Sequence, residues 1–99
     1  MKWNDKDMDD NRILAAEGFF DDLDDVPPVA GVFVFVDANS DVKYIGTAPD
    51  GHLSDAAQRA YEGGKGQGAT LVGWARTFSY SKALSLAADW TAKYNPPNN

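Results

Sequence analysis

Hydrophobic and polar residues alternate most regularly in the middle of the chain. Residues 31–37, GVFVFVD, place valines on one face of an extended segment and phenylalanines on the other. Because both faces are apolar, we expect a central strand that is covered on both sides. Residues 38–41 have the composition of a turn, and residues 42–47 return as a second strand. The connection is too short for a parallel crossover, which predicts an antiparallel hairpin.

The N-terminal quarter has the spacing of a helix instead. Between residues 8 and 25, apolar side chains recur every three or four positions. These side chains are Ile13, Ala16, Phe20 and Leu23. Two prolines, Pro27 and Pro28, follow and end the segment, since proline cannot continue a helix. We therefore expect an acidic N-terminal helix.

The second half of the chain predicts a helix, a strand and a helix in that order. Residues 53–62 carry a complete helical stripe of apolar side chains, residues 69–78 have strand composition, and residues 82–94 form the last helix. The glycine-rich loop at residues 63–68 lacks the residue order of a phosphate-binding P-loop.

These elements predict an α+β fold. We expect a small three-stranded antiparallel or mixed sheet that is flanked by helices, with the acidic helix as an addition at the N-terminus. The sequence divides on this basis into an acidic helical segment, residues 1–26, and an α+β domain, residues 27–99.

The net charge of -6 lies entirely in the N-terminal segment. Residues 1–25 hold nine acids and three bases, whereas residues 26–99 hold six of each. A nucleic-acid-binding protein usually has a basic surface, and neither part of this sequence has an excess of basic residues. The acids either form a solubilising surface or engage a basic partner protein. The candidate binding residues are Asp21, Asp22, Asp24 and Asp25, with Lys65 of the glycine loop as a candidate phosphate contact.

Composition excludes several classes of site. The chain has no cysteine, so it forms no disulfide and no cysteine-ligated zinc centre, and its one histidine, His52, cannot build a histidine cluster. No apolar run approaches the roughly 20 residues of a membrane span. The N-terminus, MKWNDKDMDD, is not a signal peptide, so we expect a cytoplasmic protein without a membrane partner.

Two tripeptides separated by ten residues carry a family resemblance. They are Gly31-Val32-Phe33 and Tyr44-Ile45-Gly46. Arg59 follows in the next predicted helix, and the chain closes on a proline-then-asparagine ending at residues 95–99. In this order the pieces resemble the GIY-YIG nuclease family, over roughly residues 27–99.

The resemblance implies a set of site residues. Family nucleases cut a phosphodiester bond with one divalent metal ion, a tyrosine that helps to activate water, an arginine that steadies phosphate charge and a helix glutamate that holds the metal. Tyr44 and Arg59 match the tyrosine and the arginine, and are the candidate catalytic residues. Phe33 stands where the first motif prefers tyrosine, so it lacks the hydroxyl. The glutamate position falls on Ala87.

Helix geometry places Ala87 on the inner side of the last helix. At about 100° per residue from Ala83, Ala87 falls at about 40° and Tyr94 at about 20°, whereas Asp89 falls at about 240°, on the far side. A hard divalent ion needs an anionic oxygen ligand, and an alanine methyl group supplies none. Plain structural roles also fit the two matched residues: Tyr44 as a sheet aromatic, and Arg59 as a surface partner of Asp55.

The sequence therefore favours a non-catalytic GIY-YIG-like binding domain without a cofactor. Its acidic surface would engage a protein partner in preference to nucleic acid, by inhibiting that partner or by mimicking nucleic acid. The alternative is a magnesium- or manganese-dependent DNA endonuclease whose metal ligand is displaced to Glu62 or to an N-terminal acid. A third possibility is self-association through Phe19 and Phe20 on the N-terminal segment.

Overall fold

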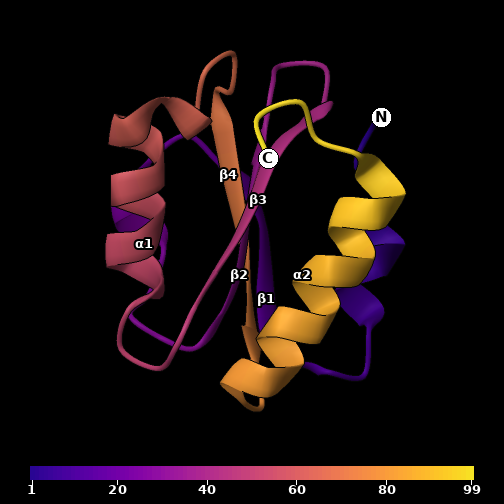
Figure 1. The fold of residues 1–99 in the computed structure, drawn as a ribbon, viewed down its shortest axis with the longest axis vertical. Helices are drawn as coiled ribbons and strands as arrows, with labels where there is room; N and C mark the ends of the chain where they lie inside the picture. Colours follow the sequence, from indigo (N-terminus) through magenta and orange to yellow (C-terminus); the bar gives the residue numbers. More distant parts are fainter.

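A four-stranded antiparallel sheet lies between two helices in the computed structural model, which describes residues 1–99 (Figure 1). The strands are β1 (Ile13–Phe20), β2 (Gly31–Val36), β3 (Val42–Ala48) and β4 (Leu71–Thr77), in the spatial order β1-β4-β2-β3. The helices are α1 (Leu53–Ala60), which continues into a π-helical turn (Tyr61–Lys65), and α2 (Tyr80–Tyr94). Two short 3-10 turns, η1 (Asp5–Asp9) and η2 (Leu23–Asp25), flank β1.

The predicted central strand is confirmed. β2 pairs with β3 on one side and with β4 on the other. Its three valines pack in one core cluster with buried residues of α2, and its two phenylalanines pack in a second cluster with buried residues of α1. None of these five side chains is more than 2% exposed. Two-sided burial is the reason that the segment is apolar on both faces.

The predicted hairpin is confirmed as well. β2 and β3 pair antiparallel, with one irregularity in register beside Val36. The turn between them is held by the carboxylate of Asp37, which accepts the backbone N–H groups of Asn39 and Asp41 at 2.9 Å each. The N–H of Asp41 is the largest influence on the Asp37 carboxyl group, and holds its pKa below the usual value.

The predicted acidic N-terminal helix is wrong. Residues 13–20 form β1, which pairs with β4 and gives the sheet a fourth strand where three were expected. The register of this pairing shifts twice, between Ile13 and Ala15 and between Glu17 and Phe20. Each shift breaks strand alternation, so the more buried positions recur at spacings that resemble those of a helix. No helix forms in this segment apart from the two short 3-10 turns.

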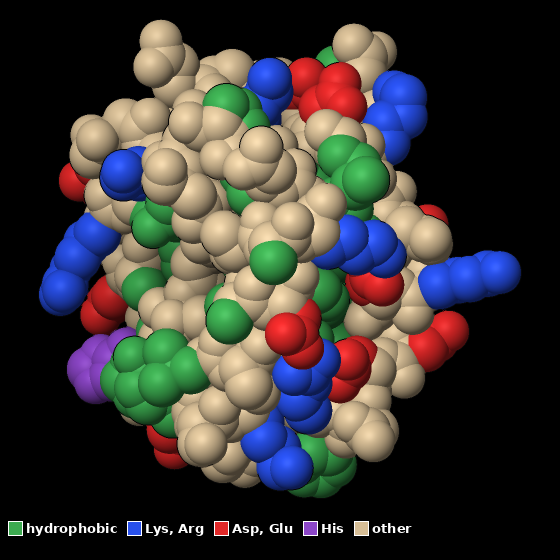
Figure 2. Space-filling view, turned by 45° about the vertical axis from the view of Figure 1, so that its right-hand side comes forward, with side chains coloured by type: hydrophobic (Ala, Val, Ile, Leu, Met, Phe, Trp, Pro, Cys, Tyr) green, Lys and Arg blue, Asp and Glu red, His purple; other side chains and the backbone are tan.

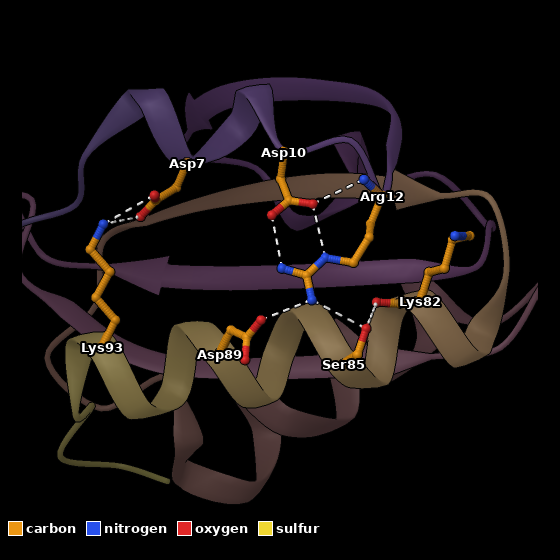
Figure 3. Close-up of polar contacts among 7 residues, drawn as sticks. All are labelled: Asp7, Asp10, Arg12, Lys82, Ser85, Asp89 and Lys93. Carbon is orange, nitrogen blue, oxygen red and sulfur yellow. Dashed lines mark hydrogen bonds and ion pairs between the residues drawn. The ribbon is translucent and has the colours of Figure 1, made fainter.

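Polar contacts fasten the N-terminal segment to α2 (Figure 3). The guanidinium group of Arg12 meets both carboxylate oxygens of Asp10, at 2.8 and 2.9 Å. It also donates to Asp89 at 2.9 Å and to Ser85 at 3.2 Å, both on α2. The hydrogen bonds from Arg12 lower the pKa of Asp10 to about 2. Asp89 lies on the outer side of the helix, as predicted. It is exposed, and it forms an ion pair with Arg12 of the N-terminal segment.

An aromatic cluster lies beside these contacts. The ring of Trp3 stacks on Tyr94 at 5.1 Å between centroids and meets Trp90 edge-on at 4.9 Å. The buried hydroxyl of Tyr94 donates to Asp7 and accepts the backbone N–H of Asn4. Burial, followed by the hydrogen bond to Asp7, raises the pKa of Tyr94 to about 12. The cluster shows that the residues before β1 are part of the packed structure.

The last helix follows its predicted geometry. Its first turn is capped by Ser79, whose hydroxyl accepts the N–H of Lys82 at 3.1 Å. It ends at Asn95 in the left-handed conformation, with φ of 46°. Its buried residues are Ala83, Leu86, Ala87, Trp90 and Tyr94. Neither α-helix has the combination of length and hydropathy that a membrane span requires.

Candidate functional site: the β3–α2 groove and the acidic cavity

The two motif tripeptides lie side by side in the β2–β3 hairpin. Phe33 of the first is paired with Gly46 of the second. A Cβ atom on Gly46 would lie 2.3 Å from the Phe33 ring, and one on Gly31 would lie 2.0 Å from the carbonyl oxygen of Ala75 on β4. Both motif glycines are therefore required by close packing in this fold.

The candidate tyrosine lies on the side of the sheet that α1 covers. The ring of Tyr44 is 5.9 Å from that of Phe33 and 6.1 Å from that of Phe35, between centroids. The ammonium group of Lys65 lies 5.7 Å from the centroid of Tyr44. The same ammonium donates to the carbonyl oxygen of Asn98 at 3.2 Å. Lys65 therefore joins the glycine loop to the second motif and to the C-terminal residues.

The second motif also borders an open groove between β3 and α2, which we call the β3–α2 groove. Its lining residues are Tyr44, Ile45, Gly46 and Thr47 from β3, and Leu84, Ala87, Ala88, Thr91 and Ala92 from α2. Ala87 thus lies beside the Tyr-Ile-Gly motif, and it is buried on the inner side of α2, as the helix geometry predicts. Tyr44 borders this groove from its edge strand while its ring packs on the α1 side, so the polar side chains of the lining on the α2 side are two threonine hydroxyl groups.

The residues of the groove do not fit a divalent cation. A hard cation such as magnesium is bound by carboxylate and carbonyl oxygens, with at least one anionic ligand in nuclease sites. The lining of the groove contains no Asp, Glu or His. Nowhere in the chain do three or more His, Cys, Asp or Glu side chains gather in a group that could hold a metal ion.

The candidate arginine lies outside the groove. Arg59 is exposed in the last turn of α1, which covers the opposite face of the sheet from α2 (Figure 1). Arg59 does not line the β3–α2 groove, and no ion pair joins it to Asp55. Tyr44 and Ala87 both border one groove, although the Tyr44 ring packs on the α1 side of the sheet, and Arg59 is not part of that lining.

A second hollow, which we call the acidic cavity, lies where η2, the end of α1 and the start of β4 meet. Its volume is about 330 Å³. Three of the four candidate binding aspartates line it: Asp21, Asp22 and Asp24. The remaining lining residues are Phe20, Leu23, Phe35, Gln58, Tyr61, Ala69, Thr70, Leu71 and Val72. Asp25 is exposed but outside the lining, and Lys65 is also outside it.

Sequence reasoning missed the walls of this cavity. The apolar spacing of residues 53–62 explains Tyr61 only as part of a helical stripe, and that of residues 8–25 places Phe20 in a helix that does not form. The usable signal was the order of residues 19–24, in which two phenylalanines pass directly into aspartates that surround one leucine. Such a junction of apolar and acidic residues is typical of the rim of a binding site.

The charges outside the cavity are mixed in sign. On the face where α2 comes forward, basic and acidic side chains are interspersed, with hydrophobic side chains between them (Figure 2). That face shows no continuous positive patch of the kind that usually accompanies phosphate binding (Figure 2).

The fold is similar to that of a nuclease domain. No family model matches the chain, and no curated protein matches it. The chain is similar to the solved GIY-YIG N-terminal endonuclease domain of UvrC from Thermotoga maritima, bound to its catalytic divalent cation, magnesium. The identity is 25% and the TM-score 0.65, over 78% of this chain and 90% of that one.

A point mutant of the same UvrC domain, also bound to the catalytic divalent cation, gives 26% identity and a TM-score of 0.64 over 78% of this chain and 89% of that one. These similarities show that the chain has a GIY-YIG-like fold, as its motifs predicted.

Proposed function

We propose that this chain is a non-catalytic GIY-YIG-like domain that binds a protein partner in the cytoplasm through its acidic surface. One observation carries the proposal. The groove beside the Tyr-Ile-Gly motif has no carboxylate in its lining, and Ala87 stands at the position that the family resemblance assigns to the metal-binding glutamate. Without an anionic oxygen the groove lacks the ligand that a metal-dependent phosphodiesterase needs.

The acids of residues 21–25 support a binding role. Asp21, Asp22, Asp24 and Asp25 are all exposed, and none forms an ion pair within the chain. Two other N-terminal acids, by contrast, are paired internally, Asp7 with Lys93 and Asp10 with Arg12. Unpaired carboxylates on a surface attract a basic partner much as phosphates do. The chain would then inhibit a nucleic-acid-binding protein or mimic its ligand.

The test is affinity capture from the native host with two charge-matched baits. One bait replaces Asp21, Asp22, Asp24 and Asp25 by asparagine. The control replaces four exposed acids elsewhere: Asp5, Asp9, Asp50 and Asp55. We expect the wild type and the control to recover the same basic protein, and the first bait to lose it. Equal recovery by the wild type and both variant baits would show that the four aspartates only make the chain more soluble, and would overturn the proposal.

A metal-dependent DNA endonuclease is the second candidate, favoured by the similarity to the UvrC domain. Its metal ligand would have to come from Glu62, which is exposed in the π-helical turn, or from an N-terminal acid. Incubation with magnesium or manganese and mixed DNA substrates separates the two candidates. Cleavage by the wild type that disappears in Arg59→Ala would establish the endonuclease and overturn the binding proposal.

A further inference from the structure

We propose that the acidic cavity holds a single apolar or aromatic side chain of a polypeptide partner, flanked by Arg or Lys. This inference rests on the proposed function and specifies where on the acidic surface the partner inserts. The cavity lies on the α1 side of the sheet, and none of its lining residues borders the β3–α2 groove. It is therefore a separate site from the β3–α2 groove.

The inner walls of the cavity are apolar and come from four separate segments. Phe35 and Val72 are buried residues of the second core cluster, and Phe20 packs against that cluster. Tyr61 meets Phe35 edge-on, with 6.1 Å between ring centroids, and is itself 50% exposed. An aromatic ring that is half open to solvent beside an apolar floor offers a surface on which an inserted side chain can pack.

The rim of the cavity carries charge of one sign. Asp21, Asp22 and Asp24 line it, and no Lys, Arg or His does. One oxygen of Asp22 accepts the N–H of Asp24 at 2.9 Å, and one oxygen of Asp24 accepts from Gln58 at 3.4 Å. Each carboxylate therefore keeps oxygen atoms free for a partner. An anionic rim around an apolar floor complements an apolar group that is flanked by positive charge.

Size and charge together select a peptide side chain as the occupant. A volume of about 330 Å³ is at the lower end of the roughly 300–1,000 Å³ of ligand sites, so it suits one side chain. Phosphate-bearing ligands are disfavoured by the three aspartates of the rim. An aromatic anchor that fills a pocket is the usual arrangement of a binding hot spot, and complementary charges around it add specificity.

The experiment titrates the full chain with three capped tripeptides, followed by backbone amide NMR. The probes are Arg-Trp-Arg, Arg-Ser-Arg and Glu-Trp-Glu. We expect Arg-Trp-Arg to shift amide signals of residues 20–24, 58–61 and 69–72, and to bind at least about tenfold more tightly than either other peptide. Equal binding by the serine peptide would show that no apolar side chain enters the cavity. Equal binding by the acidic peptide would show that the negative rim does not select positive charge. Either result would overturn the inference.

Two variants test the location. Ala69→Leu fills the cavity, and Ala15→Leu adds the same atoms at an exposed position on β1. The triple change Asp21→Asn, Asp22→Asn and Asp24→Asn neutralises the rim but keeps at position 22 a side-chain oxygen that can accept the N–H at position 24 and cap η2. Its control neutralises Asp5, Asp9 and Asp50. Affinity for Arg-Trp-Arg should fall about tenfold in Ala69→Leu and in the rim variant, and stay unchanged in both controls.

The outcomes separate this inference from the proposed function. If no peptide shifts the cavity signals while capture still depends on the four aspartates, the partner binds the acidic surface elsewhere and the cavity inference fails. If Arg-Trp-Arg binds the cavity as expected while the wild type cleaves DNA through Arg59, the cavity inference stands and the non-catalytic proposal fails.

Discussion

Gly46 and Phe33 illustrate how a sequence motif can record packing as well as chemistry. The ring of Phe33 occupies the space where any larger residue at position 46 would place its Cβ atom. Gly31 is similarly held against the backbone of β4. Both glycines of the motif pair therefore follow from the close approach of neighbouring strands. Their presence supports a GIY-YIG-like fold, but activity has to be argued from the groove itself.

The packing role of Gly46 can be measured by substitution. In Gly46→Ala the new methyl group overlaps the Phe33 ring, which we expect to lower the free energy of unfolding by about 1–3 kcal/mol. Urea denaturation gives this value. Phe33→Leu removes the overlapping ring atoms. Gly46→Ala should therefore cost less free energy of unfolding in the Phe33→Leu background than in the wild type.

Gly18 provides the matched control on β1, because a Cβ atom there would meet nothing within 4 Å. Gly18→Ala should leave stability unchanged or raise it by a few tenths of a kcal/mol to about 1 kcal/mol. An equal loss in both alanine variants would show that backbone conformation, and not the Phe33 contact, explains the glycine at position 46.

At the scale of elements, the local pattern of apolar residues was enough to predict an element wherever a single periodicity continued along its whole length. β2 alternates without a break, and the stripe of α2 continues from Ala83 to Tyr94, so the strand, the hairpin and the inward direction of Ala87 could all be predicted. β1 could not, because its two register shifts place its more buried residues three apart, as in a helix.

The β3–α2 groove and the acidic cavity also differ in how far the sequence predicts them. The groove could be anticipated because helix geometry and one motif define both of its sides. The acidic cavity is assembled from η2, the end of α1, β2 and the start of β4, segments that are distant in sequence. No local pattern encodes that meeting point, so only the acidic residues of its rim, Asp21, Asp22 and Asp24, were found as candidates.

The pairing of β1 with β4 predicts the effect of truncation. Deleting residues 1–25 would expose one edge of β4 and remove Trp3 and Phe19 from their contacts with the core. We expect the remaining chain to lose cooperative thermal unfolding and to aggregate, since a long unpaired strand edge recruits other chains. Circular dichroism and light scattering report both changes. A truncated chain that stays monomeric and unfolds at the wild-type temperature would contradict this role of β1.

At the scale of the whole molecule, the N-terminal acids fall into two groups, one paired within the chain and one unpaired. Asp7 and Asp10 fasten the first residues to α2 through Lys93 and Arg12. The acids of residues 21–25 have no internal ion pair and face outward. Phe19 and Phe20, considered as a surface for self-association, are instead half-buried against the two core clusters. The half-buried positions of Phe19 and Phe20 leave no continuous apolar face for self-association at this end of the molecule.

The pairing of Asp10 makes stability depend on acid pH. Folding lowers the pKa of Asp10 from 3.8 to about 2, so its contribution is fully present above about pH 4 and is lost as the pH falls toward 2. Asp10→Asn should cost about 1 kcal/mol at neutral pH, a value typical of a paired surface carboxylate. The difference from wild type, measured by urea denaturation, should shrink across that window.

Asp9→Asn is the control for this titration, because Asp9 is exposed and forms no ion pair. It should match the wild type at every pH. A deficit in Asp10→Asn that persisted unchanged below pH 2 would show that shape, and not charge, explains the contribution of this residue.

Calorimetric titration with manganese tests the central claim, that Ala87 leaves a nuclease-like groove without its metal ligand. The account predicts no saturable uptake by the wild type or by Ala15→Glu, which adds a carboxylate at an exposed position on β1. We expect uptake of about one ion per chain by Ala87→Glu, because the new carboxylate would enter the groove beside the Tyr-Ile-Gly motif. Uptake of one ion by the wild type, as tight as that by Ala87→Glu, would contradict the claim, and so would no uptake by Ala87→Glu.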